Sequence, residues 1–101
     1  MIAAPVTSVV AAPSHLNADA RIDFKCAALD CLCRVVSLGG HELAIDMADT
    51  TEVDASGLGV LVLVYKRARE QGVMTRLLHA GEPVRSLLMT TKLEPLFRFD
   101  R

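Results

Sequence analysis

The fold of this chain is decided at one short junction, Val53-Asp54-Ala55-Ser56-Gly57-Leu58-Gly59-Val60. A β-branched residue followed by an aspartate, a serine and a glycine is typical of the place where a strand gives way to a helix. A very apolar run, residues 58–65, follows directly. We expect a helix to begin near Leu58, with a carboxylate and a hydroxyl at the positive end of its dipole.

The run 58–65 is ambiguous by propensity alone, because its valines favour a strand. Its apolar residues nevertheless recur at helical spacing and continue into the charged stretch 66–70, and Gly72 then supplies a stop. The set at that spacing is Leu58, Leu61, Val62, Tyr65 and Ala68. We therefore predict a helix here.

Strands and helices alternate on both sides of the junction. Strands are predicted at 6–11, 41–47 and 73–78, with short edge strands at 51–53 and 96–99. A third helix begins at Pro83, and its inner stripe is Val84, Leu87, Leu88 and Thr91. This order predicts an α/β fold, a small and mostly parallel four-stranded sheet with helices packed on it.

The first helix is predicted over 18–38, with Asn17 as its N-cap and Gly39 and Gly40 just beyond its end. Apolar residues recur along it at alternating spacings of four and three, which predicts the buried face. That face consists of Ile22, Cys26, Leu29, Cys33 and Val36. On this interpretation Cys26 and Cys33 are small core residues.

Length and composition restrict the class of protein. The chain has 101 residues, of which 51% are hydrophobic, so we expect one folded domain over 1–101. The net charge is -1 with no basic block, no tryptophan and one tyrosine, which argues against nucleic-acid binding. No apolar run approaches the ~20 residues that span a membrane, so we expect no membrane insertion.

The cysteines and the N-terminus indicate the compartment. The three cysteines, Cys26, Cys31 and Cys33, are odd in number and close together, which argues against a disulfide framework and favours a reducing cytoplasm. The first residues lack the basic region of a signal peptide. We expect a cytoplasmic protein.

Candidate catalytic and metal-binding groups are few. The three histidines lie far apart in sequence without ligand spacing, and Ser56 lies in Asp-Ala-Ser-Gly, not in the Gly-x-Ser-x-Gly elbow of hydrolases. No Gly-rich phosphate loop occurs. We expect no catalytic site, no metal and no cofactor. A hydrolase using Ser56 would require a histidine within hydrogen-bond reach of its hydroxyl.

The junction itself supports two interpretations. In the first, Ser56 or Asp54 only caps the second helix, and Gly57 lets the chain turn close to the sheet. In the second, the hydroxyl also accepts a phosphate from a partner kinase. The added charge of about -1.5 to -2 then changes what this surface binds while the fold is kept.

Residues 43–99 resemble the STAS family, named for sulfate transporters and anti-sigma factor antagonists. The resemblance rests on the strand ending in Asp46-Met47, the junction 53–61, Gly72, and the Pro-led segment 82–88. Single-domain members are mostly anti-sigma factor antagonists in bacterial partner-switching pathways. The resemblance implies a partner that is both an anti-sigma factor and a serine kinase of the histidine-kinase-like ATPase class, with a phosphatase that reverses the modification.

The chain departs from the family at one position. The family pattern is Asp-Ser-Ser/Thr-Gly with the acceptor hydroxyl directly after Asp, and that position is Ala55 here. Ser56 matches the second hydroxyl and is the phosphoacceptor candidate. Three hypotheses stay open: Ser56 is the acceptor, the protein is a permanently active antagonist, or the domain docks partners without this switch.

The resemblance also implies where the partner binds. The predicted partner-binding residues surround the helix start and are Asp54, Ala55, Ser56, Gly57 and Leu58. The alternative function is a STAS subunit docked on the ATPase of a membrane transporter, such as a lipid-transport ABC system. Such a protein would use the same helix end as its contact.

Overall fold

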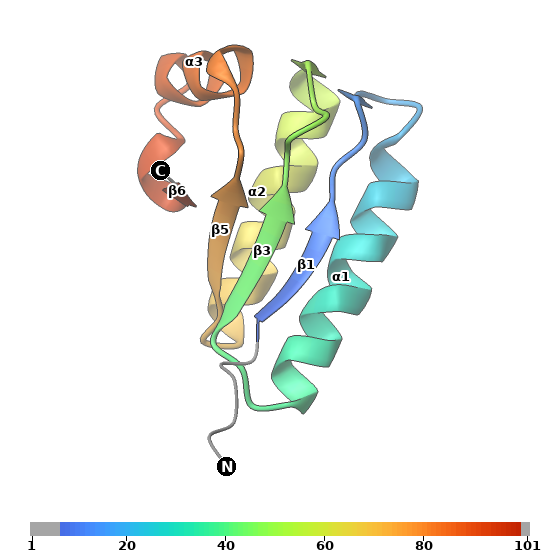
Figure 1. The fold of residues 1–101 in the computed structure, drawn as a ribbon, viewed down its shortest axis with the longest axis vertical. Helices are drawn as coiled ribbons and strands as arrows, with labels where there is room; N and C mark the ends of the chain where they lie inside the picture. The colour runs from blue at the N-terminus through green and yellow to red at the C-terminus, as the bar shows by residue number, and fades with distance from the viewer. Residues whose placement is uncertain (1–6, 100–101) are drawn as a thin grey trace.

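The computed structural model describes residues 7–99. Within them the chain forms six strands, three α-helices and one 3-10 helix, η1 (Figure 1). In chain order these are β1 (Thr7–Ala11), β2 (His15–Leu16), α1 (Arg21–Ser37), β3 (Glu42–Asp46), β4 (Glu52–Val53), α2 (Ala55–Glu70), β5 (Met74–Leu78), α3 (Glu82–Thr90), η1 (Glu94–Leu96) and β6 (Arg98–Phe99).

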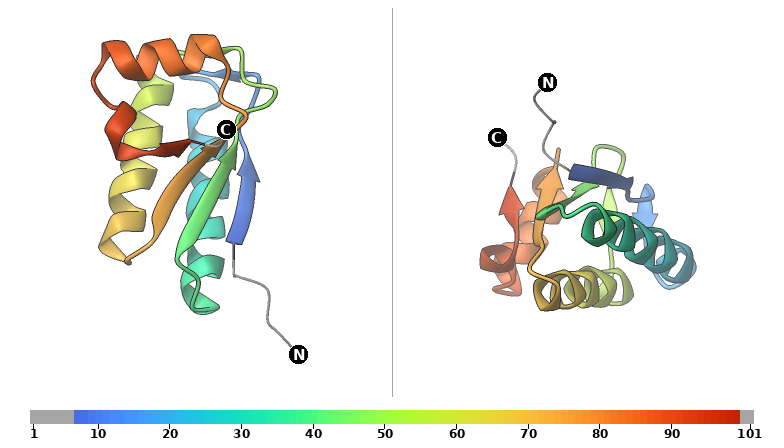
Figure 2. Two further views of the ribbon diagram at one scale, coloured as in Figure 1. Left: turned by 60° about the vertical axis from the view of Figure 1, so that its left-hand side comes forward. Right: turned by 90° about the horizontal axis from the view of Figure 1, so that it is seen from below.

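The main sheet has the order β1-β3-β5-β6, and every neighbouring pair is parallel. Helices α1 and α2 lie side by side on one face of it, and α3 lies beyond the carboxyl end of β5 (Figures 1 and 2). No helix within residues 7–99 covers the opposite face. The predicted α/β architecture with a parallel four-stranded sheet is confirmed.

The core lies between this sheet and the two helices. Val10, Ile45 and Leu77 occupy one row of the parallel register and are buried, as alternation along a strand requires. Helix α1 packs over β1 and β3, and α2 packs over β5. The buried side chains of α2 include Val60, Leu61, Val64 and Ala68, which belong to the same core cluster. Sheet and helices thus share one hydrophobic core.

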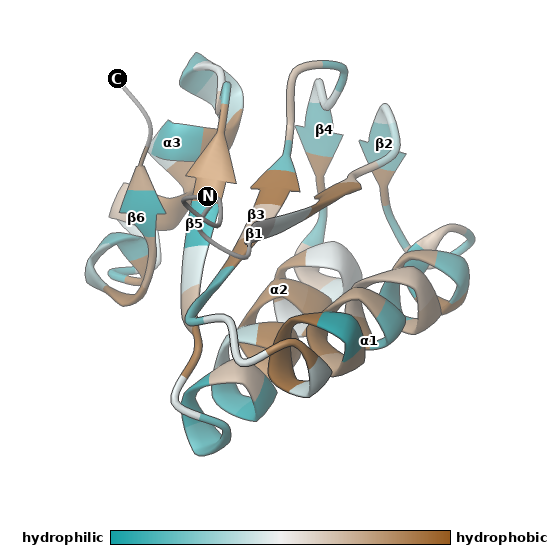
Figure 3. Cartoon of the chain, turned by 60° about the horizontal axis from the view of Figure 1, so that its bottom comes forward, coloured by the Kyte–Doolittle hydropathy of each residue, from teal (hydrophilic) through white to brown (hydrophobic). Residues whose placement is uncertain are grey.

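The predicted buried face of α1 is wrong. The buried residues of the helix are Phe24, Ala28, Cys31, Leu32 and Val35. Ile22, Cys26, Cys33 and Val36 are exposed, and Leu29 is half-buried. Figure 3 shows hydrophobic residues recurring along α1 between hydrophilic ones. Two apolar stripes therefore share the helical period, and packing against the sheet selects the one that carries Phe24.

The different buried face of α1 also changes which cysteine belongs to the core. Cys31 is buried, whereas Cys26 and Cys33 are exposed. The predicted start of the helix is also early, because residues 17–20 form a turn and the helix begins at Arg21. Asn17 Oδ1 accepts hydrogen bonds from the backbone N–H groups of Asp19 and Ala20, so Asn17 holds this turn and is not the N-cap.

Helix α2 begins three residues before the predicted position, at Ala55. Its buried face contains Leu61 and Ala68 as predicted, but Val60 and Val64 take the places expected for Val62 and Tyr65, which are half-buried. In α3, Val84 and Leu88 are buried, Leu87 is half-buried and Thr91 is exposed. At the C-terminal end, strand β6 covers only the second half of the expected 96–99 segment, since η1 occupies Leu96.

A second, two-stranded sheet pairs β2 with β4 in parallel. The sequence indicated only the β4 half of it. Thr50 Oγ1 donates to the carbonyl of Pro13 at 2.8 Å, and the backbone N–H of Thr51 donates to that of Ser14 at 2.9 Å. These bonds join the two segments that lead into β2 and β4, shortly before α2 begins.

Candidate functional site

The start of α2 is capped by Asp54. This residue has an extended backbone, and its Oδ1 accepts a hydrogen bond from the backbone N–H of Gly57 at 2.9 Å. Its carbonyl accepts from Leu58 at 2.8 Å, the first bond of the helix. Of the two capping residues that the sequence left open, the structure therefore assigns Asp54.

Gly57 fixes this helix start against β2. A Cβ at this position would lie 2.1 Å from the carbonyl oxygen of Leu16, so no side chain fits without a shift of the backbone. The same carbonyl accepts a hydrogen bond from the N–H of Asp54 at 3.2 Å. Leu16 is fully buried. The expectation that Gly57 allows a close approach is confirmed, and the contact is to the small sheet.

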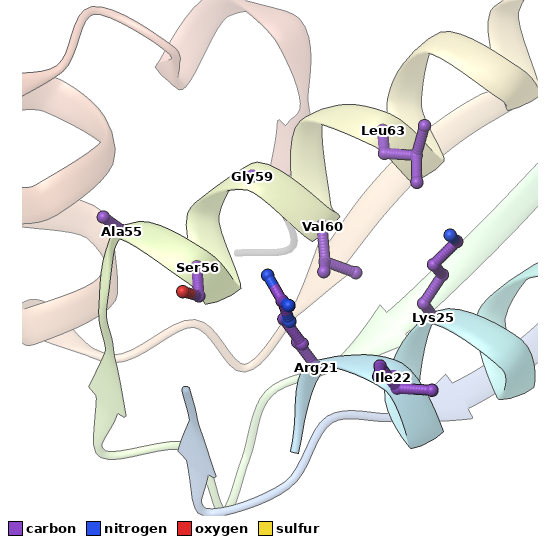
Figure 4. A pocket seen from close by; sticks show the side chains of 8 residues that line it. All are labelled: Arg21, Ile22, Lys25, Ala55, Ser56, Gly59, Val60 and Leu63. Atoms are coloured by element: carbon purple, nitrogen blue, oxygen red, sulfur yellow. The ribbon is translucent and has the colours of Figure 1, made fainter. Parts of the chain in front are cut away.

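Ser56 lies in the first turn of α2 and is half-buried. Its hydroxyl makes no hydrogen bond with any residue from 7 to 99, so it is free of a capping role. The side chain lines a groove of about 500 Å³ between α1 and α2 (Figure 4). The hydroxyl is therefore open to a reagent that enters this groove.

Two basic residues of α1, Arg21 and Lys25, line the same groove. Arg21 reaches from α1 towards the first turn of α2, between Ser56 and Val60 (Figure 4). Both side chains are exposed and form no ion pair within the described part of the chain. Sequence reasoning missed them, because their orientation follows from the rotation of α1, which the periodicity assigned wrongly.

The electrostatics of the groove are positive at one end. In a parallel sheet with helical crossovers, both helices begin at the carboxyl end of the strands. The positive ends of the α1 and α2 dipoles therefore meet at this groove, where Arg21 and Lys25 add formal charge. Cations in the first turns of a helix are unfavourable to its own dipole. A negatively charged group is thus favoured here.

The five residues predicted to bind a partner differ in exposure. Asp54 and Ala55 are exposed, and Ser56 is half-buried. Gly57 is buried, and the half-buried Leu58 packs against the core. The surface around the helix start is therefore formed by Asp54, Ala55 and Ser56, while Gly57 and Leu58 hold it in place.

Comparison with known families decides the classification. The family model of the STAS domain matches residues 8–101. The chain belongs to the STAS family. A comparison with curated proteins finds no match.

Solved structures support the same assignment for this STAS domain. It is 25% identical to a candidate anti-sigma factor antagonist of Thermotoga maritima, with a TM-score of 0.76 over 97% of this chain and 84% of that one. The anti-sigma factor antagonist SpoIIAA in its unphosphorylated form is 15% identical, with a TM-score of 0.74 over 100% and 85% of the two chains. A sulfate transporter family protein of Wolinella succinogenes is 15% identical, with a TM-score of 0.70 over 94% and 77%.

The strand ends of this STAS domain carry one further polar pair, Asp46 and His79. Asp46 Oδ1 accepts from the backbone N–H of Ala48 at 2.9 Å and lies 3.1 Å from His79 Nδ1. The hydrogen bond from Ala48, and then the His79 ring, lower the pKa of Asp46 below its usual value. His79 has a positive φ of 56°, which turns the chain after β5. Asp46 therefore stabilises the loops at this end of the sheet.

Other kinds of site find no support in the described residues. Between residues 7 and 99 no histidine hydrogen-bonds to Ser56, and no group of three or more His, Cys, Asp or Glu side chains is placed to hold a metal ion. A catalytic triad on Ser56 is therefore not formed in this part of the chain. No helix in the same range is long and apolar enough to cross a membrane.

Proposed function

We propose that this STAS domain is a cytoplasmic anti-sigma factor antagonist in a partner-switching pathway. It binds an anti-sigma factor that is also a serine kinase of the histidine-kinase-like ATPase class, and binding frees the sigma factor for transcription. The domain itself needs no cofactor and is not an enzyme, because the kinase supplies ATP. A phosphatase restores the unmodified form.

The observation that carries this proposal is the free hydroxyl of Ser56. It lies in the first turn of α2, half-exposed, with Asp54 taking the capping role beside it. A serine that caps a helix would lose a stabilising bond on modification, whereas this one can be modified without breaking a bond within residues 7–99. The likeness to SpoIIAA, which is known in unphosphorylated and phosphorylated forms, supports phosphorylation of this fold as a mode of control and does not select the acceptor residue.

Phosphorylation at Ser56 would act through charge. The Ser56 oxygen attacks the γ-phosphorus of ATP, an O–P bond forms, the bond to the β–γ bridging oxygen breaks, and ADP and the hydroxyl proton leave. The new group adds about -1.5 to -2 charge beside the carboxylate of Asp54. A partner that accepts the unmodified helix start then meets two adjacent anions and is released.

The test is affinity capture of the tagged domain from its own cells, with intact-mass analysis of the bait. Recovery of the kinase, together with a phosphate mass shift that is absent in Ser56→Ala and present in Ser86→Ala, would support the proposal. Ser86 is a matched control because it is exposed on α3 and lies outside the groove. A mass shift that persists in Ser56→Ala would reject Ser56 as the acceptor.

Substitution tests the charge effect directly. Ser56→Asp should weaken binding to the captured kinase about tenfold or more, since one unfavourable charge contact of 1.4 kcal/mol is a factor of ten. Asparagine has nearly the same shape as aspartate but carries no charge, so Ser56→Asn should bind like the wild type. Equal affinity for the aspartate variant and the wild type would contradict a switch at this position.

Ala55 gives the other hypotheses their specific support. It is exposed at the position where the family pattern places its acceptor hydroxyl, and it cannot be phosphorylated. Recovery of the kinase without any mass shift would indicate a permanently active antagonist, and Ala55→Ser would then be expected to create a site. Recovery of transporter ATPase subunits would instead indicate a docking subunit of a lipid-transport ABC system and reject the sigma-factor function.

A further inference from the structure

The outward side of the two sheet-packed helices forms a continuous surface. Its first hollow, at the helix starts, is the groove of about 500 Å³ that contains Ser56. A second hollow of about 410 Å³ lies between the opposite ends of the same helices, with Leu29, Cys33 and Val36 on its α1 side. We name the two hollows together, with the helix faces that join them, the α1–α2 seam.

The α1 side of the seam is apolar although the core does not use it. Ile22 is 62% exposed and Val36 is 39% exposed, and Leu29 lies half-buried between them. These three residues recur every seven positions and therefore lie on one side of the helix. An apolar stripe that stays in water at this regularity indicates a surface that another molecule covers.

The charges along the seam are unequal. Arg21 and Lys25 line the first hollow, while one cation and one anion, Arg67 and Glu70, line the second. The end beside Ser56 is thus basic and the far end is balanced. The complementary ligand is apolar along its length and acidic at one end.

We propose that the α1–α2 seam docks an acidic amphipathic helix of a partner protein. Its apolar side chains would pack on Ile22, Leu29 and Val36, and its acidic end would lie between Arg21 and Lys25. Helix α1 has 17 residues and is about 25 Å long at 1.5 Å per residue, so the docked helix needs four to five turns. The identity of this partner as the anti-sigma factor rests on the proposed function, but the docking chemistry does not.

This surface would couple docking to the modification of Ser56. Ser56 and Ala55 line the first hollow, which makes the seam continuous with the helix start of α2. A negative group on Ser56 would lie across the groove from Arg21 and Lys25 and would compete for them with the acidic end of the docked helix. Phosphorylation would then neutralise the positive charge at the basic end of the seam without changing the fold.

The first experiment uses designed helical peptides of about 18 residues as probes. All share one leucine stripe at helical spacing, and their first or last turn carries glutamates, glutamines or lysines. Each is titrated into the isotope-labelled domain while backbone NMR shifts and the dissociation constant are measured. We expect an acidic-ended peptide to bind about tenfold tighter than its lysine counterpart, a difference of about 1.4 kcal/mol, and to shift resonances on the seam.

Variants of the protein make the test specific. The double variant Arg21→Glu, Lys25→Glu should reverse the preference to the lysine-ended peptide. Its helix should stay folded, because acidic residues favour the start of a helix. Lys92→Glu makes the same kind of charge change on an exposed residue between α3 and η1 that lines neither hollow, and it should leave the preference unchanged. Ser56→Asp should weaken binding of the acidic-ended peptide and leave binding of the glutamine-ended peptide unchanged.

Two results would overturn the proposal. One is equal affinity for the glutamate and lysine peptides in the wild-type protein. The other is a set of shifts on the helix-free face of the sheet, at Val9 and Met74, which are also exposed apolar residues. Either would show that the probes bind by hydrophobic contact alone.

The two proposals can fail separately. If the capture experiment recovers no kinase but the peptides show the expected preference, the docking proposal is supported and the sigma-factor function is rejected. If the kinase is captured and modifies Ser56, yet the Arg21→Glu, Lys25→Glu variant binds it as well as the wild type does, the function stands and the seam is not its docking surface.

Discussion

The two helices that flank the groove begin in opposite ways. Helix α2 begins with a side-chain cap from Asp54 and with Gly57 buried against Leu16. The N-cap of α1 is Ala20, whose side chain makes no capping hydrogen bond, and the first helical residue is Arg21. One start is fixed by hydrogen bonding and close packing, and the other is held only through the turn at Asn17.

The difference indicates that the two helix starts have different roles in the groove: α2 positions Ser56, and α1 supplies positive charge. The start of α2 holds Ser56 in a defined position, because the cap and the small sheet fix the residues on either side of it. The start of α1 carries Arg21 and Lys25, which its own dipole disfavours, together with Asp23, which the dipole favours. The two cations therefore lower the stability that the charges of this helix start would otherwise contribute. A cost of this kind is expected where charge serves recognition and not folding.

The largest expected effect tests which side of α1 faces the core. Phe24→Ala should lower the free energy of unfolding by about 3–5 kcal/mol, because Phe24 is buried and its removal leaves a cavity. Ile22→Ala, two residues earlier on the exposed stripe, should cost less than about 1 kcal/mol. Urea unfolding of both variants measures the difference. Similar losses would contradict the observed rotation of the helix.

The next effect tests the packed start of α2. Gly57→Ala should destabilise the protein by about 3 kcal/mol, because the added methyl group overlaps the backbone of Leu16. Gly59→Ala is the matched control in the same helix, since open space surrounds a Cβ there. It should stabilise the protein by about 0.5–1 kcal/mol through helix propensity. If both alanines were neutral in thermal unfolding, the close approach would be refuted.

A smaller effect separates the cap from the packing. Asp54→Ala should cost about 1 kcal/mol, because the N–H of Gly57 loses its acceptor. Asp54→Asn keeps an oxygen at the same place and should retain most of this stability. Chemical denaturation of the pair measures the cap, and hydrogen exchange at Gly57 should accelerate in the alanine variant alone. Equal exchange in both variants would assign the protection to the small sheet.

The smallest effect lies away from both helix starts and depends on pH. The pKa of Asp46 is lowered from its ordinary value of 3.8, so the contribution of this carboxylate is complete above that value and is lost as the pH falls through the lower folded pKa. Asp46→Asn should therefore be less stable than the wild type at about pH 6, by less than about 1 kcal/mol for an exposed pair.

The measurement for Asp46 is unfolding in urea between about pH 6 and pH 2. The difference between the wild type and Asp46→Asn should shrink as the solution is made more acidic. A difference that grew with acidity would contradict a lowered pKa. The two helix starts should show no comparable change in this variant, which makes it a control region for the groove.

Much of the fold was predictable because its signals are local. Turn residues such as Gly39, Gly72 and Pro83 mark where elements end or begin, and short apolar runs define the three longer strands, β1, β3 and β5. The candidate site was located from the sequence for a related reason, since capping chemistry and the family pattern occupy the same residues, 53–61, and its binding role stays a prediction. The pair β2–β4 was not, because two-residue strands leave no periodicity and depend on contacts across the chain, such as Thr50 with Pro13.

The sequence by itself determined the order of elements, the parallel α/β architecture, the strand-to-helix junction at residues 53–60 and the candidate hydroxyl of Ser56. Only the tertiary structure decided the rotation of α1, because its two apolar stripes have the same period and differ only in what they pack against. That rotation buries Phe24 and Cys31, leaves Ile22 and Val36 in water, and places Arg21 and Lys25 across from Ser56. Helical periodicity in the sequence shows that an apolar stripe exists, but packing of the helix against the sheet decides whether that stripe is buried or exposed.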